Sequence, residues 1–180
     1  MGEKGGGAGN RDLRIEDVHM GKLEGEFFIE DDESKIERLE LIGAGVREGE
    51  ILKLPLIEAA YFEGKGFLGS GKSEGELLEL AASSDSLATE KFAVLKHLRD
   101  KGYIVRDGEG KSDFMRIYRK GIRIGEDRSE SVVKVLREGE KPELAPDLEK
   151  AGRMRKALVY AFVGKEGGIL FVKAYRVGFD

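Results

Sequence analysis

The sequence predicts an α+β (mixed α/β) chain, with a small N-terminal α/β module followed by a C-terminal domain built on a mixed sheet. Strand-like and helix-like apolar patterns alternate along almost all of the 180 residues. The charge also changes sign midway. Residues 1–90 carry 10 Lys and Arg against 21 Asp and Glu, a balance of −11, whereas residues 91–180 carry 21 against 14, a balance of +7. The polar segment SSDS, residues 83–86, lies beside this change and is typical of a boundary.

These patterns divide the chain into three parts. We expect a flexible, glycine-rich tail over residues 1–12, an N-terminal α/β domain over residues 13–86 and a C-terminal domain over residues 87–180. A basic second half fits a nucleic-acid partner, because each neutralised phosphate releases a counterion. The alternative is a basic protein surface that binds no nucleic acid.

The composition narrows the class of protein. Hydrophobic residues make up 40% of the chain, enough for a packed core, and charged residues make up 37%, above the roughly 25% of ordinary domains. This charge surplus fits a heat-adapted, thermophilic protein. The absence of cysteine excludes disulfides, thiolate zinc sites and cysteine nucleophiles. Because His19 and His97 are the only histidines, a multi-histidine metal centre is excluded too, and we expect no metal or other cofactor.

The same sequence lacks membrane signals. No apolar run approaches the roughly 20 residues of a membrane span, and the first residues lack the apolar core of a signal peptide. We therefore expect a cytoplasmic protein with no membrane partner.

The N-terminal half contains two predicted strands and three predicted helices. Alternation predicts strands at residues 14–19 and 22–30, joined by a Met-Gly turn. Helical spacing of apolar residues predicts helices over residues 32–41, 51–62 and 73–82.

Capping residues support these helices and one more. Pro55 suits the first turn of the 51–62 helix, and Ser73 and Glu76 have the spacing of a capping box. The clearest helix of the chain runs from Thr89, which can cap it, to Gly102, which ends it.

Strands dominate the remainder of the chain. A helix is predicted within residues 147–156, between the third and fourth of five strand-like runs. The runs span residues 103–106, 114–118, 131–137, 157–163 and 169–177.

One motif suggests a nucleotide site. Residues 66–73 read GFLGSGKS and match the P-loop pattern, with Lys72 as its lysine. A P-loop follows a buried strand, whereas this segment follows a predicted helix. The favoured interpretation is therefore a glycine-rich surface turn before a helix, with a P-loop nucleotide-binding protein as the alternative.

Basic residues gather around one tyrosine. Tyr118 ends a predicted strand, and its hydroxyl could contact phosphate or accept a proton, or its ring could stack on a base. The more common alternative is a ring packed in the core. A second basic cluster, Arg153, Arg155 and Lys156, precedes the strand at 157–163. The basic residues near Tyr118 are Arg116, Arg119, Lys120, Arg123 and Arg128.

The order of these features resembles the archaeal tRNA-splicing endonuclease (tRNA-intron endonuclease) family. A strand ends in tyrosine, about ten residues of loop follow, and then come a valine-rich strand, a helix, Arg155-Lys156 and an apolar strand. Upstream, LKLPLIEAAYFEGKG and KFAVLKHLRDKGYIVRDG are similar to the family's N-terminal helix and linker helix. The resemblance spans roughly residues 20–177 and implies a nuclease-like C-terminal domain.

The resemblance implies metal-free cleavage of precursor tRNA at bulge–helix–bulge sites by a Tyr-His-Lys triad. The tyrosine deprotonates the 2′-hydroxyl, the histidine protonates the leaving 5′-oxygen and the lysine stabilises the transition state. The products are a 2′,3′-cyclic phosphate and a 5′-hydroxyl. In this sequence the tyrosine falls on Tyr118 and the lysine on Lys156. The histidine position falls on Arg128, which cannot give up a proton near neutral pH.

Two smaller departures accompany the missing histidine. The segment GEGKSDF lacks the aromatic residue that the family often has before this strand. The family's arginine that clamps a bulged base falls here on Glu149 or, with a shift of one residue, on Lys150.

The resemblance thus implies a structural, non-catalytic subunit of a heterotetrameric endonuclease, paired with a catalytic subunit and precursor tRNA. The RNA contacts expected on this reading are Arg119, Lys120, Arg123, Arg128, Arg153 and Arg155. Two alternatives stay open beside the P-loop. One is an active endonuclease that uses Tyr118 and Lys156, and the other is an RNA-binding adaptor without an endonuclease partner.

Overall fold

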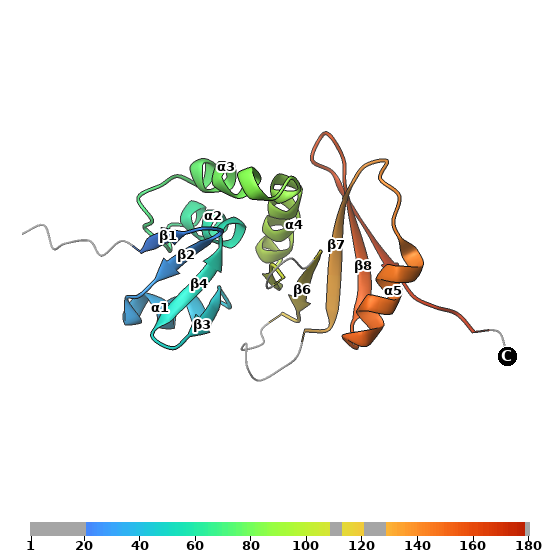
Figure 1. Cartoon of the computed structure of the whole chain (residues 1–180), viewed down its shortest axis with the longest axis horizontal. Coiled ribbons are helices and arrows are strands. Elements are labelled where there is room, and N and C mark those ends of the chain that lie inside the picture. The colour runs from blue at the N-terminus through green and yellow to red at the C-terminus, as the bar shows by residue number, and fades with distance from the viewer. Residues whose placement is uncertain (1–20, 109–112, 121–128, 179–180) are drawn as a thin grey trace, which may run out of the picture.

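A computed structural model describes residues 21–108, 113–120 and 129–178, which form two sheets joined by helices (Figure 1). The N-terminal sheet is antiparallel, with the strand order β1-β2-β4-β3. Helix α1 (Glu33–Leu41) begins where the Asp32 carboxylate accepts a hydrogen bond from the Lys35 N–H at 3.0 Å. The strands are β1 (Lys22–Glu24), β2 (Phe27–Glu30), β3 (Val46–Glu48) and β4 (Ile51–Pro55).

Three helices connect this sheet to the second one. Helix α2 (Leu56–Gly64) follows β4 directly, and its residues 56–62 are all buried. Helix α3 (Glu74–Ser84) starts with a capping box between Ser73 and Glu76. Helix α4 (Ala88–Asp100) then leads into the second sheet.

The C-terminal sheet has five strands in the order β5-β6-β7-β8-β9. Its pairs are antiparallel except β7 and β8, which run parallel and are joined by helix α5 (Leu144–Arg153). Neighbouring parallel strands need a crossover connection of this kind, because a tight turn reverses the chain and can join only antiparallel strands. The strands are β5 (Ile104–Arg106), β6 (Phe114–Tyr118), β7 (Ser131–Arg137), β8 (Ala157–Val163) and β9 (Ile169–Ala174).

The five-stranded sheet is covered on both faces. Helix α4 lies between the two sheets, and the main core joins Leu54 of β4 and Phe92 of α4 to Val133 of β7 (Figure 1). Helix α5 covers the other face, where Ala151 packs with Phe114 and Leu158. This two-sided burial explains why β7 and β8 are nearly continuous apolar runs.

The predicted α+β class is confirmed, and the strands at 114–118, 131–137 and 157–163 coincide with β6, β7 and β8. The prediction of one helix over residues 51–62 is wrong in its first five residues, which form β4. Leu52 and Leu54 alternate into the core while the strand pairs with β2, so the period there is two.

Smaller differences concern element ends. Thr89 does not cap α4, which starts at Ala88 after Leu87, whose N–H donates to the Asp85 carboxylate at 2.8 Å. The strand predicted at 22–30 is a hairpin that turns at Gly25, and the strand at 14–19 lies outside the described residues. Among the described residues, no helix is long and apolar enough to cross a membrane.

Candidate active site

The strand order brings the two candidate catalytic side chains to the same end of the sheet. Strand β6 is antiparallel to β7, with Ile117 opposite Ser131, and β7 is parallel to β8, with Ser131 opposite Ala157. The last residue of β6 and the residues just before β7 and β8 therefore lie at the same end of the sheet. Tyr118, Ser129 and Lys156 occupy these three positions.

Tyr118 is held by the sheet. It pairs with Ile104 of β5 and is only 7% exposed. Alternation along β6 places it on the same face as Phe114, the face that α5 covers. Within the described residues, its hydroxyl forms no hydrogen bond.

Lys156 is positioned by the C-terminus of α5. The N–H of Lys156 donates to the Ala151 carbonyl at 3.0 Å and that of Arg155 donates to the Gly152 carbonyl at 2.9 Å. Arg155 has a φ of 56°. These features form a Schellman motif, in which the left-handed position is normally glycine. The motif ends the helix and starts β8 one residue after Lys156.

The Lys156 ammonium is anchored across the sheet. Its Nζ donates a hydrogen bond to the carbonyl oxygen of Ser129, and Ser129 is itself buried. Ser129 directly follows Arg128, the residue at which the sequence predicts the family's histidine position. The lysine is therefore bound to the segment that carries the third candidate position, although Arg128 itself lies outside the described residues.

The predicted RNA-contact residues differ in what their side chains contact within the protein. Arg119 forms an exposed ion pair with Glu130, and Arg153 donates to Glu149 at 2.5 Å. The ammonium of Lys120 lies 4.8 Å from the centre of the Tyr103 ring.

The remaining three predicted contacts differ in kind. Arg155 is exposed on the α5–β8 turn. Arg123 and Arg128 lie outside the described residues.

A groove of about 430 Å³ next to Lys156 contains two cations that sequence reasoning missed. Lys173 of β9 and Arg176 beyond it line this groove together with Lys156, and among the described residues that line it Glu149 is the one acid. The pairing of β9 with β8, which places Lys173 opposite Val159, brings them there.

A buried polar cluster fixes α5 to the sheet, and it was also missed. The Tyr160 hydroxyl donates to one oxygen of Asp147 at 2.9 Å, and Lys134 Nζ donates to the other at 2.8 Å. Burial, reinforced by the bond to the carboxylate, raises the pKa of Tyr160 above its usual value. Alternation alone could have shown that Lys134 and Tyr160 share a face, but not that Asp147 lies over them.

The histidine that the structure describes, His97, does not complete the triad. His97 lies on α4, on the opposite face of the sheet, with its ring centre 5.6 Å from that of Phe171. His19 lies outside the described residues.

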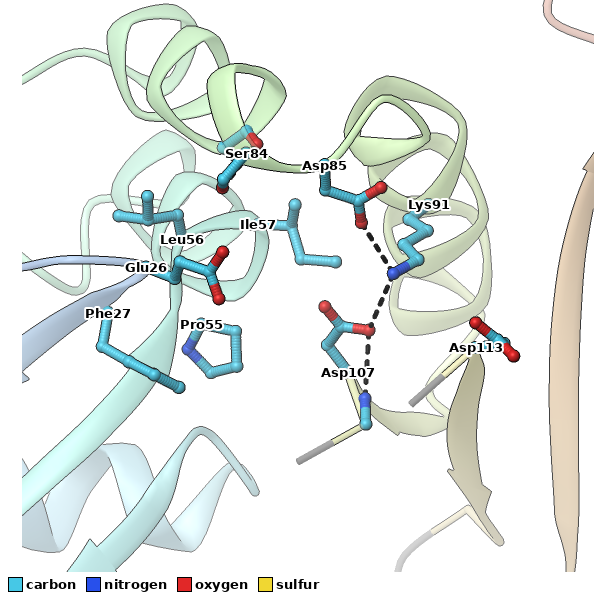
Figure 2. A pocket seen from close by; sticks show the side chains of 12 residues that line it. Glu26, Phe27, Pro55, Leu56, Ile57, Ser84, Asp85, Lys91, Asp107 and Asp113 are labelled. Carbon is cyan, nitrogen blue, oxygen red and sulfur yellow. Dashed lines mark hydrogen bonds and ion pairs between the residues drawn. The ribbon is translucent and has the colours of Figure 1, made fainter. Parts of the chain in front are cut away.

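A second candidate region is an acidic cavity of about 330 Å³ between the two sheets (Figure 2). Lys91 reaches into it and forms ion pairs with Asp85 at 2.7 Å and Asp107 at 3.7 Å. Burial raises the pKa of Asp107 to about 6, although Lys91 opposes the shift. In the described part of the chain, no three potential ligands converge as a metal site.

The P-loop-like segment is built as a turn. It follows helix α2 rather than a strand, and the N–H of Ser70 donates to the Glu63 carboxylate at 2.8 Å. Ser73 caps α3. A carboxylate thus occupies an N–H that a phosphate-binding loop would offer to its ligand, and the P-loop alternative lacks support.

Comparisons with known proteins identify the family. The family model of the tRNA intron endonuclease catalytic C-terminal domain matches residues 88–171. The tRNA-splicing endonuclease of Pyrococcus furiosus is 34% identical over 165 residues, 82% of this chain and 94% of that protein. The enzyme of the same name from Pyrococcus horikoshii is 33% identical over 147 residues, 76% of this chain and 83% of its own. That of Methanococcus vannielii is 29% identical over 167 residues, 88% and 92% respectively. The chain therefore belongs to the tRNA-splicing endonuclease family.

Proposed function

We propose that this chain is the structural subunit of a heterotetrameric tRNA-splicing endonuclease, which removes introns from precursor tRNA at bulge–helix–bulge sites. The observation that carries the proposal is the arginine at position 128, where the family's general-acid histidine is expected. A guanidinium holds its proton near neutral pH, so it can bind phosphate but cannot protonate a leaving 5′-oxygen. Tyr118 and Lys156 would then be relics of a catalytic site or RNA contacts.

An exposed apolar edge supports a partner subunit. Strand β9 is the last strand of the sheet, and one of its edges has no partner strand among the described residues. Large apolar side chains on and after it are open to solvent, and an edge of this kind is a site for pairing with another chain. They are Leu170 (63% exposed), Val172 (40%), Tyr175 (72%) and Val177 (60%).

We also propose that the predicted division of the chain separates two roles. Residues 87–180 would carry the RNA-facing site, and residues 13–86 would dock by charge on a basic partner subunit. Charge reversal of several exposed acids of the N-terminal part, such as Glu37, Glu48 and Glu50, should weaken tetramer formation in analytical ultracentrifugation. If the tetramer forms unchanged, the docking role is wrong.

Cleavage of a bulge–helix–bulge precursor in EDTA tests the main proposal. The chain is assayed alone and mixed with a family subunit that retains the full Tyr-His-Lys triad. We expect cutting only in the mixture, and equal cutting when this chain carries Tyr118→Phe. Tyr103→Phe, which removes a hydroxyl just before β5 and keeps the ring that Lys120 contacts, is the matched control.

The second candidate function is an active endonuclease. The favourable observation is that Tyr118 and Lys156 occupy the same end of the sheet, with Lys156 bound to Ser129. Cutting by the chain alone, lost in Tyr118→Phe or Lys156→Ala, would establish it and overturn the structural role. Restoring histidine by Arg128→His should then raise the rate. No cutting under any condition would leave an RNA-binding adaptor.

A further inference from the structure

A smaller cavity of about 230 Å³ lies between the N-terminal sheet and the β5 edge of the C-terminal sheet. Its walls are partly apolar, from Phe27, Val46 and Pro55. Two arginines from neighbouring strands, Arg106 of β5 and Arg116 of β6, also line it. Tyr118 and Lys156 do not line it, so it is separate from the candidate active site.

The two arginines place like charges next to each other, with Arg116 exposed to solvent. Arg106 and Arg116 are directly opposite each other in the antiparallel register, where like charges destabilise a sheet. The Nε of Arg106 is buried and has no hydrogen-bond partner in the described structure. A buried donor without an acceptor costs about 1–3 kcal/mol.

Three carboxylates and Lys53 also line the cavity, and none of these carboxylates forms an ion pair with the two arginines. Glu58 accepts hydrogen bonds from the N–H groups of Gly45 and Asp107, each at 3.0 Å, and lies 3.6 Å from Arg99. Asp107 faces Lys91 and the Gly108 N–H, as the dashed lines in Figure 2 show.

The third carboxylate is Glu48, which pairs with Lys53 at 2.6 Å. All three acids therefore have partners other than the two arginines. Among the described residues, neither Arg106 nor Arg116 forms an ion pair.

We propose that this cavity binds a phosphate group, held between the guanidinium groups of Arg106 and Arg116. Each guanidinium offers a planar fork of donors that suits phosphate oxygens, and the ligand would supply the acceptor that Arg106 Nε lacks. The volume is below the roughly 300–1,000 Å³ of sites for drug-sized ligands, which fits a small anion. The apolar walls displace water and so strengthen the charge interaction.

Two sources could provide this group, namely free phosphate and the terminal phosphate of a nucleotide. Calorimetric titration of the full chain with inorganic phosphate, and separately with adenosine 5′-monophosphate, distinguishes them. Saturable binding of phosphate alone identifies the free anion, and tighter binding of the monophosphate identifies a nucleotide end. Saturable binding of neither ligand by the unmodified chain overturns the proposal.

Variants test the two arginines. Arg106→Met and Arg116→Met should each weaken phosphate binding at least tenfold, and Arg106→Lys should weaken it less than Arg106→Met. Arg38→Met, which removes an exposed charge on α1, is the matched control and should bind as the unmodified chain does. Equal weakening in Arg38→Met would show unspecific charge attraction and contradict the site.

Melting temperatures show whether Arg106 is a binding residue or a structural one. Without phosphate, Arg106→Met should melt at or above the temperature of the unmodified chain, because it removes both the like-charge pair and the buried donor. With saturating phosphate, the unmodified chain should melt at a higher temperature than Arg106→Met. A variant that melts lower without ligand would show that Arg106 is a structural residue, and the site would be wrong. The inference does not depend on RNA cleavage by Tyr118.

Discussion

The ammonium of Lys156 donates a hydrogen bond to the carbonyl of Ser129 and, with the bond from the Ala157 N–H to the Glu130 carbonyl at 3.1 Å, ties the start of β8 to the segment before β7. Hydrogen bonds that involve a charged group contribute about 1.5–3 kcal/mol to stability. The contact also holds the ammonium at the end of the sheet where Tyr118 lies. A residue of the site therefore doubles as a structural link between two parallel strands.

Lys156→Met tests this link, because methionine keeps much of the aliphatic stem but removes the donor. We expect the free energy of unfolding in urea to fall by about 1–2 kcal/mol, the range for a partly exposed charged hydrogen bond. Lys165→Met, in the exposed β8–β9 turn, is the control and should change stability little. Equal stability of both variants would show that the contact is not formed in solution.

Arg155→Gly should stabilise the protein. Arg155 occupies the left-handed position of the Schellman motif with a φ of 56°, which costs a residue with a side chain about 1–2 kcal/mol. Glycine relieves this strain, but it also raises the conformational entropy of the unfolded chain, which offsets part of the gain. We therefore expect the free energy of unfolding in urea to rise by about 0.5–1 kcal/mol.

The control variant for Arg155→Gly should change the stability in the opposite direction. Arg153→Gly, two residues earlier in the last turn of α5, should destabilise by up to about 1 kcal/mol. A loss of stability in Arg155→Gly would contradict the motif. If RNA affinity falls while stability rises, the strained arginine is retained for its guanidinium.

The sequence predicted most of the elements but fewer of their contacts. Strands β6, β7 and β8 were recovered because their apolar runs are bounded by turn-forming residues. Residues 51–62 were read as one helix because Leu52, Leu56 and Ala59 also fit a helical spacing. Leu52 belongs to a strand because it pairs with Arg47 of β3 and, further away in the sequence, with Glu30 of β2, and neither pairing follows from apolar spacing alone.

The candidate site was predictable as residues and not as an arrangement. Tyr118 and Lys156 followed from the family's order of features, whereas their common place depends on the parallel pairing of β7 and β8. Lys173 and Asp147 were missed because their neighbours depend on the pairing of β9 with β8 and on the packing of α5 against the sheet. Neither is visible in a local pattern.

Asp147 should be the most sensitive polar residue beneath α5. Asp147→Asn leaves the ammonium of Lys134, only 16% exposed, without its countercharge, and loss of one member of a buried pair costs about 3–5 kcal/mol. Tyr160→Phe removes one hydrogen bond and should cost about 1–2 kcal/mol. Urea unfolding distinguishes the two. A double variant, Asp147→Leu with Lys134→Met, should recover part of the loss because no charge remains buried, and failure to recover would point to packing rather than charge.

Asp107 should make the protein less stable as the pH rises from 4 to 7. Its folded pKa is raised to about 6, above the roughly 3.9 of an unfolded aspartate, so the folded state binds the proton more tightly. The stability gained from the protonated form is complete below about pH 4 and is lost as the pH passes through 6, by about 2–3 kcal/mol in all. Asp107→Asn cannot ionise, so its stability relative to the unmodified chain should increase over this interval in urea unfolding at stepped pH. Asp113→Asn removes the same charge from an exposed carboxylate 62% open to solvent and should follow the unmodified profile. If Asp107→Asn also follows that profile, burial does not raise the pKa of Asp107, and the cavity between the two sheets is more hydrated than its geometry indicates.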